Sequence, residues 1–189
     1  MGRSKNRPQG QVRIIGGQWR GRRIEFYAAC GLRPTGDRIR ETLFNWLQGE
    51  VENADCLDLF TGSGALAFEA ASRGARRVVM VENNRATQRQ LQNQIALFKA
   101  TNIELVPGTA QGYLQGPRQA FDLIFLDPPF DRTFLPEIID LLGRGHHLKP
   151  HTKIYLEYPL TEIPDLPPGW AFVRQKKTGE VGYGLVALL

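Results

Sequence analysis

From residue 56 onward, short apolar runs alternate with segments of helical periodicity, and this alternation restricts the possible folds more than any other feature. The apolar runs that indicate strands are 56–60, 77–81, 103–106, 121–126 and 153–157. Helices are predicted between them at 65–72, 85–99, 110–114 and 134–142. Strands that are apolar along almost their whole length are typical of a parallel sheet buried on both faces. The pattern therefore predicts an α/β fold, with helices on both faces of a mostly parallel sheet.

The C-terminal region departs from this alternation. Residues 171–173 and 184–188 are apolar runs that flank the polar stretch 176–180. Such a pair predicts an antiparallel hairpin that is appended to the sheet. With these two strands the sheet is expected to contain seven.

The N-terminal fifty residues are expected to form a small extension. Residues 1–10 are polar and basic, and they are predicted to be a disordered tail. A hairpin is predicted from the runs 12–15 and 23–26. A helix follows, with Asp37 as its predicted N-cap and with Ile39, Leu43, Trp46 and Leu47 on one face. The predicted organisation is a tail at 1–10, a hairpin and helix extension at 11–50, and an α/β domain at 51–189.

Positive charge is concentrated at the start of the chain. Residues 1–40 contain ten Lys or Arg against two acids, a net charge of +8, so the other 149 residues sum to −3 within the total of +5. Nine of the ten are arginine, whose planar fork suits bidentate contact with phosphate. This asymmetry favours a nucleic-acid partner. The alternative is a solvated tail that keeps the protein in solution.

Several classes of protein are not expected. There is no apolar run of membrane-spanning length and no apolar signal segment at the N-terminus, which predicts a protein without a membrane partner. The two cysteines form no metal-binding pattern and favour a reducing cytosol, so a cytoplasmic location is predicted. A metal site built from His146, His147 and His151 is not expected, because their spacing is irregular and no acid accompanies them.

Polar and glycine residues follow the predicted strands, where an α/β sheet binds its ligands. Gly62 and Gly64 form a strand-to-helix turn that lets the backbone approach a ligand closely. Glu82 ends the next strand, where a carboxylate can accept hydrogen bonds from the two hydroxyls of a ribose. A lone G-x-G is weak evidence, but with Glu82 it indicates a cofactor that contains a nucleoside. After the third strand, 107–111 is either a base-edge contact or a plain turn and helix start.

The stretch FLDPPFD, residues 125–131, follows the fourth predicted strand. Two prolines make a stiff loop without N–H donors. The Asp127 carboxylate and the Pro128 carbonyl then present two acceptors at fixed spacing, which suits an NH₂ group with two hydrogens to donate. Phe130 offers a flat apolar face on which a base can stack. The alternative is a turn stiffened by proline.

These residues together resemble the class I methyltransferases that use S-adenosylmethionine and methylate an exocyclic amine. Asp127-Pro128-Pro129-Phe130 resembles their motif (Asp/Asn/Ser)-Pro-Pro-(Tyr/Phe/Trp), and 57–64 resembles their cofactor loop. RIIGGQWRGRR at 13–23, RPTGDRIRETLFNWL at 33–47 and GEVGY at 179–183 are similar to the bacterial small-subunit rRNA guanine-N2 methyltransferase family, usually called RsmD. The resemblance covers about residues 11–189. One departure is Thr109, where members of the family usually have an aspartate, so Thr109, Gln111 or a backbone group is expected to contact the adenine amine.

The resemblance implies a Rossmann-like methyltransferase domain at 51–189 with an RNA-binding side at 11–50. It implies methyl transfer from S-adenosylmethionine to the exocyclic N2 of a guanine in 16S rRNA, within an assembled or assembling small ribosomal subunit, without a metal and as a monomer. The implied catalytic residues are Asp127, Pro128, Pro129 and Phe130. The implied cofactor-binding residues are Asp58, Phe60, Gly62, Gly64, Glu82, Asn83, Ala110 and Gln111. The implied RNA-binding residues are Arg13, Trp19, Arg20, Arg22, Arg23, Arg33 and Arg38.

Alternatives remain at this point. Adenine N6 fits the same pair of acceptors, so a DNA adenine-N6 methyltransferase is the nearest one, although 189 residues leave little room for a sequence-reading domain. A non-catalytic RNA-binding module on a methyltransferase fold is the second. For Trp19, packing within the hairpin is as reasonable as contact with RNA. Arg38 and Arg40 are alternatively placed to form salt bridges on their own helix.

Overall fold

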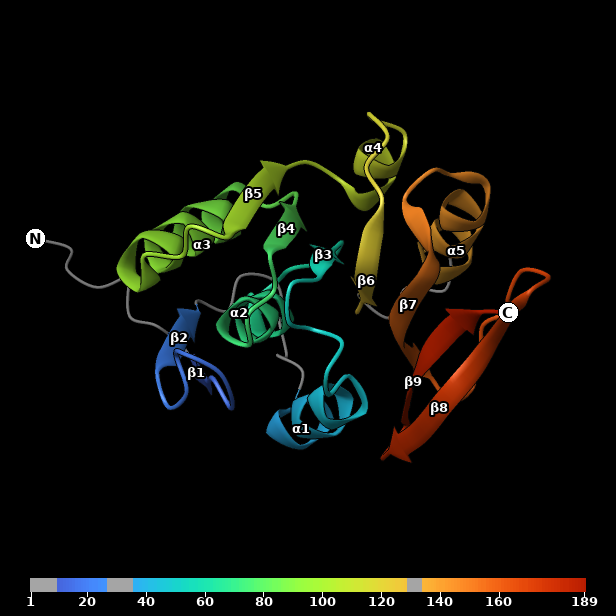
Figure 1. Ribbon diagram of the computed structural model, residues 1–189, viewed down its shortest axis with the longest axis horizontal. Helices are drawn as coiled ribbons and strands as arrows, with labels where there is room; N and C mark the ends of the chain where they lie inside the picture. Colours follow the sequence, from blue (N-terminus) through green and yellow to red (C-terminus); the bar gives the residue numbers. More distant parts are fainter. Residues whose placement is uncertain (1–9, 27–35, 129–133) are drawn as a thin grey trace, which may run out of the picture.

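A computed structural model of the protein describes residues 10–26, 36–128 and 134–189 (Figure 1). Its strands are β1 Gly10–Arg13, β2 Arg23–Phe26, β3 Asp55–Asp58, β4 Arg77–Glu82, β5 Ile103–Pro107, β6 Phe121–Leu126, β7 Leu148–Pro159, β8 Trp170–Thr178 and β9 Val181–Leu188. Its helices are α1 Asp37–Trp46, α2 Ala65–Ser72, α3 Arg85–Phe98, α4 Ala110–Leu114 and α5 Phe134–Arg144.

Seven strands form one sheet in the order β5-β4-β3-β6-β7-β9-β8. The five strands from β3 to β7 are parallel, while β9 runs antiparallel to both β7 and β8. This confirms the predicted fold, with a parallel sheet and an appended C-terminal hairpin. The chain adds β4 and β5 on one side of β3 and then β6 and β7 on the other, so its order reverses between β3 and β6. Ligands of such sheets bind beyond the carboxyl ends of the strands at that reversal.

The two faces of the sheet carry separate apolar layers. Alternate residues of one strand point to opposite faces, and Cys56 accordingly packs with α1, α2 and α3, whereas Leu57 packs with α4 and α5. Figure 1 shows this division, with α4 and α5 on the side of the sheet away from α1 and α2. The strongly apolar strands therefore arise because both faces are covered, as the sequence pattern predicts.

The predicted bounds are correct for α2, α4 and β6, whereas β7 is longer than predicted. It begins at Leu148 rather than at 153, because Leu148 pairs with Phe121 ahead of an irregularity in the register. The polar residues between Leu148 and Lys153 do not form the apolar run by which a buried strand is recognised. The end of a strand can thus lie outside its apolar part.

The β1–β2 hairpin packs along α2 and α3 and shares their core. Ile14, Trp19 and Ile24 lie in the same apolar cluster as α2. The hairpin loop lies at the C-terminal end of α2, where the Trp19 N–H donates to Ser72 Oγ at 2.9 Å. Phe26, at the other end of the hairpin, packs with Ala65 at the start of α2. The loop that carries Arg20 therefore lies far from the carboxyl ends of the strands, and Phe26 lies near them.

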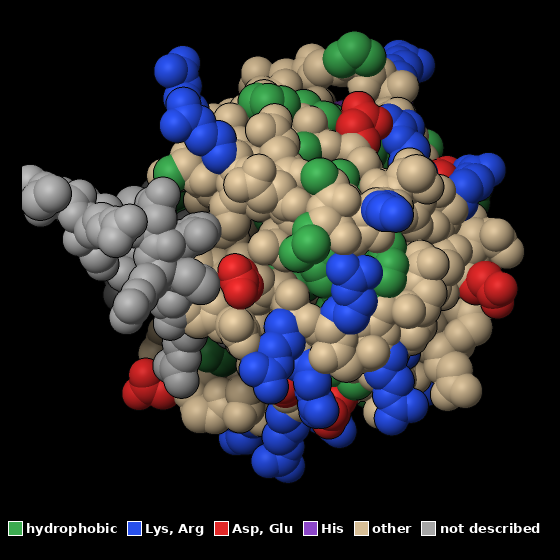
Figure 2. All heavy atoms as spheres, turned by 90° about the vertical axis from the view of Figure 1, so that its left-hand side faces the viewer, with side chains coloured by type: hydrophobic (Ala, Val, Ile, Leu, Met, Phe, Trp, Pro, Cys, Tyr) green, Lys and Arg blue, Asp and Glu red, His purple; other side chains and the backbone are tan. Residues whose placement is uncertain are grey.

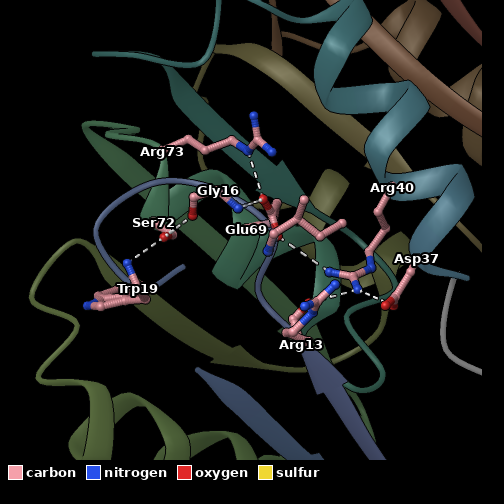
Figure 3. A network of polar contacts seen from close by, with 9 residues as sticks. Arg13, Gly16, Trp19, Asp37, Arg40, Glu69, Ser72 and Arg73 are labelled. Carbon is pink, nitrogen blue, oxygen red and sulfur yellow. Dashed lines mark hydrogen bonds and ion pairs between the residues drawn. The ribbon is translucent and has the colours of Figure 1, made fainter. Parts of the chain in front are cut away.

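A buried carboxylate, Glu69 of α2, joins this hairpin to α1 (Figure 3). Its Oε2 accepts from the Ile15 N–H at 2.8 Å, and its Oε1 accepts from the Gly16 N–H at 2.8 Å. Arg73 Nε donates to Oε1 at 2.7 Å, and Arg40 Nη1 lies 3.4 Å from Oε2. One side chain thus satisfies donors from three separate parts of the chain.

Arg40 is fully buried, and it completes the link between α1 and the hairpin. Its Nη2 donates to Asp37 Oδ1 at 2.6 Å and to the Arg13 carbonyl oxygen at 2.9 Å. The alternative of a salt bridge within the helix is confirmed for Arg40. The prediction that Asp37 is the N-cap is wrong, because Gly36 occupies that position and Asp37 lies in the first turn. There its carboxylate is close enough to pair with Arg40 three residues on.

None of the helices in the described parts of the chain has the length and hydrophobicity to cross a bilayer.

Candidate active site

The carboxyl ends of β3, β4 and β6 bring three acids together: Asp58, Glu82 and Asp127. Asp58 is the most deeply buried of the three, with 2% of its surface exposed. The pKa of Asp58 is raised to about 8, first by burial and then by the nearby charges of Asp127 and Glu82. The sequence separates these residues by up to 69 positions, yet the parallel strands gather them at one edge.

The Asp58 carboxyl has one oxygen without a hydrogen-bond partner among the described residues. Its Oδ1 accepts a long bond of 3.4 Å from the Phe60 N–H, while its buried Oδ2 accepts none. An unpaired polar atom in a buried position is costly. A cluster of acids with an unsatisfied oxygen favours a positively charged, hydrogen-bonding ligand. The residues present therefore fit a cationic cofactor such as S-adenosylmethionine.

Gly64 lets the loop after β3 pass close to α2 and α3. Its φ is +81°, and a Cβ at this position would lie 2.9 Å from side-chain atoms of both Leu91 and Phe68. Gly64 is also the N-cap of α2, so the loop turns directly into the helix. Gly62, with φ of +51°, donates its N–H to Glu82 Oε2 at 3.1 Å. The loop and the carboxylate at the end of β4 are thus in direct contact.

Asn84 is a residue of this edge that the sequence analysis did not select. Its Oδ1 caps α3 by accepting from the Ala86 and Thr87 N–H groups at 2.9 and 3.1 Å. Glu82 Oε1 in turn accepts from the Asn84 N–H at 2.8 Å, while Asn83 between them is exposed. An Asn directly before a helical pattern is a known capping signal, which could have identified it.

The residues after β5 are held mainly by local contacts. Thr109 is the N-cap of α4, and its Oγ1 accepts from the Gly112 N–H at 3.1 Å. Gln111 donates to Glu137 Oε2 at 3.1 Å, and Ala110 is buried. Phe60, from the loop after β3, meets Phe134 edge-to-face at 6.4 Å between centroids. The sequence-predicted residues Phe60, Ala110 and Gln111 therefore border the side of the edge nearest α4 and α5.

Asp127 and Pro128 lie directly beyond β6, with Asp127 half-buried and Pro128 buried. Pro129 and Phe130 lie outside the described residues. On the adjacent strand β7, the buried Tyr155 hydroxyl donates to Glu157 Oε1 at 2.6 Å. Burial first, and then the charges of Glu157 and Asp127, raise the pKa of Tyr155 above its usual range. Tyr155 and Glu157 are further residues of the site that sequence reasoning missed, since they read only as part of a strand.

A cleft of about 660 Å³ opens beside Pro128 on the α5 side of the sheet. Acidic and proline residues make up much of its lining, including Asp140, Glu162 and Asp165. Such a lining repels phosphate groups. A polyanion is therefore expected to approach the site from the opposite, α1 side.

The arginines predicted to bind RNA are exposed where they are described: Arg13, Arg20, Arg22, Arg23 and Arg38. Arg22 lies with its guanidinium 3.8 Å from the Phe98 ring centroid, and it donates to the Leu97 carbonyl oxygen at 3.1 Å. Arg23 donates to Gln11 Oε1 at 2.9 Å. Arg33 lies outside the described residues. On the face shown in Figure 2, which is the α3 side of the molecule, Lys and Arg side chains cover more of the surface than Asp and Glu side chains do.

Trp19 requires a correction. Its side chain is 7% exposed and packs against Phe98 at 5.3 Å and Phe68 at 6.2 Å between ring centroids. A ring whose faces are covered cannot stack on a base. The alternative interpretation, packing, therefore describes Trp19, although its ring partners lie in α2 and α3 and not within the hairpin.

No group of three metal-binding side chains occurs in the described part of the chain. His147 is buried, and both of its ring nitrogens face backbone oxygens, those of Gln119 and Leu114, at 3.0 Å. Neither nitrogen is open to a ligand.

Comparison with known proteins agrees with this geometry. A family model described as "Conserved hypothetical protein 95" matches residues 12–187. Ribosomal RNA small subunit methyltransferase D of Escherichia coli (strain K12) is 44% identical over 177 residues, which are 93% of this chain and 89% of that protein. The protein of the same name from Haemophilus influenzae is 40% identical over 181 residues, 94% of each chain.

A solved structure of a putative methyltransferase, yhhF, from Escherichia coli superimposes with a TM-score of 0.87. It is 41% identical, and the match covers 95% of this chain and 98% of that one. The fold of almost the whole chain is therefore shared with this putative methyltransferase. From the family match and the curated relatives together, the chain belongs to the conserved hypothetical protein 95 family, that of the ribosomal RNA small subunit methyltransferase D proteins.

Proposed function

We propose that this protein transfers a methyl group from S-adenosylmethionine to the exocyclic N2 of a guanine in 16S rRNA. Its family membership makes it an rRNA methyltransferase that uses S-adenosylmethionine. Asp127 and Pro128 support an exocyclic amine as the target, and the resemblance of residues 13–23, 33–47 and 179–183 to the rRNA guanine-N2 methyltransferase family favours guanine N2 over adenine N6. Asp127 and Pro128 place a carboxylate and a carbonyl beside the acidic edge, where Oδ2 of the buried Asp58 has no hydrogen-bond partner among the described residues.

The cofactor is held by residues at the carboxyl ends of β3 and β4 and beyond β3, β4 and β5. These are Asp58, Phe60, Gly62, Gly64, Glu82, Asn83, Ala110 and Gln111. Glu82 binds the ribose hydroxyls in place of its present bond from the Gly62 N–H, and the Asp58 carboxylate offsets the positive charge of the ligand. When bound, S-adenosylmethionine supplies an electrophilic methyl group on a positively charged sulfur.

The target amine needs help to act as a nucleophile, because its lone pair is conjugated with the base. The Asp127 carboxylate and the Pro128 carbonyl accept hydrogen bonds from the two N–H groups of the amine. These bonds favour a tetrahedral nitrogen with a localised lone pair. Pro129 stiffens this loop, and Phe130 stacks on a base that has left its helix. Such alignment contributes several kcal/mol to lowering the barrier, and the fixed acceptors add electrostatic stabilisation.

The proton leaves after methyl transfer. A nitrogen with four substituents is strongly acidic, so Asp127 does not have to act as a full base beforehand. Its carboxylate is already hydrogen-bonded to the N–H that is lost. A carboxylate in that position accepts the proton and passes it to solvent.

The substrate is further proposed to be rRNA within an assembled or assembling small subunit, methylated in the cytoplasm by a monomeric protein. Arg13, Arg20, Arg22, Arg23, Arg33 and Arg38 hold its phosphates. The relatives named for small-subunit rRNA support this choice of substrate.

The test is methyl transfer from labelled S-adenosylmethionine to unmodified small subunits, protein-free 16S rRNA and duplex DNA, followed by identification of the nucleoside. Label in N2-methylguanosine from the particle or the rRNA is the expected result. Label in N6-methyladenine from DNA would overturn the choice of both substrate and atom. Cofactor binding without transfer to any of the three would overturn the choice of these substrates.

A further inference from the structure

We propose that the edge strand β8 is a second RNA-binding surface, which contacts phosphates that flank the target nucleotide. The proposal rests on the proposed function, since it assumes an RNA substrate. It concerns a part of the chain that the proposed mechanism does not use.

The register of the sheet places the end of β8 at the same edge as the active site. Leu126 of β6 pairs with Leu156 of β7, so Asp127 lies level with Glu157. Glu157 pairs with Tyr183 of β9, which pairs with Lys176 of β8. Three strand spacings separate Lys176 from Asp127, a distance of about 14 Å along the sheet. Strands β8 and β6 also run in the same direction, so β8 ends at the edge of the sheet where the active site lies.

This end of β8 is strongly basic and exposed. Arg174, Lys176 and Lys177 all lie in its exposed part, and in the described regions of the chain none of them forms an ion pair with a carboxylate. Glu180 in the hairpin turn is the one acid between residues 170 and 183. The three cations are therefore available to phosphates.

Two of these cations lie on the α1 side of the sheet. Arg174 pairs with Leu185 and Lys176 with Tyr183, and paired residues of an antiparallel ladder point to the same face. Tyr183 stacks on Trp46 of α1 at 5.7 Å between ring centroids, and Lys176 Nζ lies 6.0 Å from the Trp46 ring centroid. Lys176 is thus held over an aromatic pair between β9 and α1.

The opposite face does not suit RNA. There the cleft beside Pro128 is lined by Asp140, Glu162 and Asp165. Phosphates that approach the site are repelled by these acids and attracted by the cations of β8 and by Arg38 of α1, which is exposed. The charges thus direct the polyanion to one side of the active site.

A competing explanation is that lysines on an edge strand prevent pairing between molecules. β8 is an edge of the sheet, so this explanation applies to it as well. The two explanations differ in what a charge-removing change affects. Protection of an edge affects self-association, whereas phosphate contact affects the salt dependence of RNA binding.

The experiment compares the double variant Lys176→Gln, Lys177→Gln with the control Arg118→Gln, Arg144→Gln. Both lose two positive charges from exposed positions. Arg118 precedes β6, and Arg144 ends α5 shortly before β7 begins. The control charges therefore lie near the amino ends of the strands, away from the active site. Binding to a 16S rRNA transcript is measured at several salt concentrations, and light scattering reports self-association.

The β8 variant is expected to bind RNA several-fold more weakly at about 0.15 M salt, with the slope of log K against log[salt] smaller by about 1 to 2. The control is expected to keep the wild-type slope. Equal slopes for the two variants would overturn the proposal, and new self-association of the β8 variant with an unchanged slope would establish edge protection instead. Wild-type protein that binds the transcript but methylates no guanine in the transcript or in unmodified small subunits would count against the proposed function alone.

Discussion

At the scale of single residues, the acidic edge determines how the site responds to pH. The pKa of Asp58 rises from 3.8 to about 8, so the folded protein holds a proton near neutral pH that the unfolded chain has lost. The contribution of this group to the free energy of unfolding therefore falls as pH rises from about 4 to about 8. A cationic cofactor favours the ionised carboxylate and must displace that proton.

The affinity for S-adenosylmethionine should accordingly increase as pH rises toward about 8 and level off above it. Asp58→Asn should bind the cofactor more weakly and lose this pH dependence. Isothermal titration between pH 6 and pH 9 measures both effects. A wild-type affinity that does not change with pH, or a variant that keeps the wild-type profile, would show that Asp58 does not titrate on binding.

Gly64 gives a second test at this scale. Gly64→Ala places a methyl group 2.9 Å from Leu91 and Phe68 in addition to requiring a positive φ. It should destabilise the protein by about 2 to 4 kcal/mol and weaken cofactor binding. Gly49→Ala is the matched control, because Gly49 also has φ of +81° but has no atom within 4 Å of the added Cβ. Urea unfolding that gives the same loss for both variants would show that the close packing at Gly64 contributes nothing.

At the scale of elements, Glu69 and Arg40 hold the hairpin and α1 onto α2 (Figure 3). Glu69→Ala leaves the Ile15 and Gly16 N–H groups without their acceptor and removes the carboxylate that faces Nη1 of the buried Arg40. Removal of one partner of a buried pair costs about 3 to 5 kcal/mol. Arg144→Ala breaks a pair with Asp140 in which the arginine is 79% exposed, and it should cost less than about 0.5 kcal/mol. Chemical denaturation compares the two, and similar losses would contradict the role given to Glu69.

The elements also show what a sequence can predict. Periodicity located α2, α4 and β6 because local apolar spacing is determined by which faces are covered. The acids Asp58, Glu82 and Asp127 could be selected because parallel strands end at one edge. Their contacts with cofactor and substrate stay predictions.

Features that depend on distant parts of the chain could not be predicted in this way. Arg40 and Glu69 are 29 residues apart, and nothing in the local pattern marks either as buried. For Trp19, the sequence likewise favoured neither packing nor contact with RNA, because residues of α2 and α3 determine whether the faces of its ring are covered. Asp37 shows that a capping residue must be assigned from the backbone, because the preceding Gly36, which has no side chain, occupies the N-cap position instead.

At the scale of the whole molecule, we expect the two parts of the basic N-terminal region to differ in role. Residues 10–26 belong to the core through Ile14 and Ile24, so their removal would unfold the protein. Residues 1–9 carry Arg3, Lys5 and Arg7. A deletion of 1–9 should reduce the slope of RNA affinity against salt by about 2 to 3 and leave the free energy of unfolding within about 0.5 kcal/mol of wild type. An unchanged slope in filter-binding assays would show that these charges do not contact RNA.

The central claim is that Asp127 orients the target amine. The most direct measurement is single-turnover methyl transfer by Asp127→Ala and Asp127→Asn, together with the dissociation constant of S-adenosylmethionine for each. We predict a rate lower by about 10² to 10³-fold or more, with cofactor affinity close to that of wild type. A rate near that of wild type would contradict the claim, and the amine would then have to be oriented by other groups.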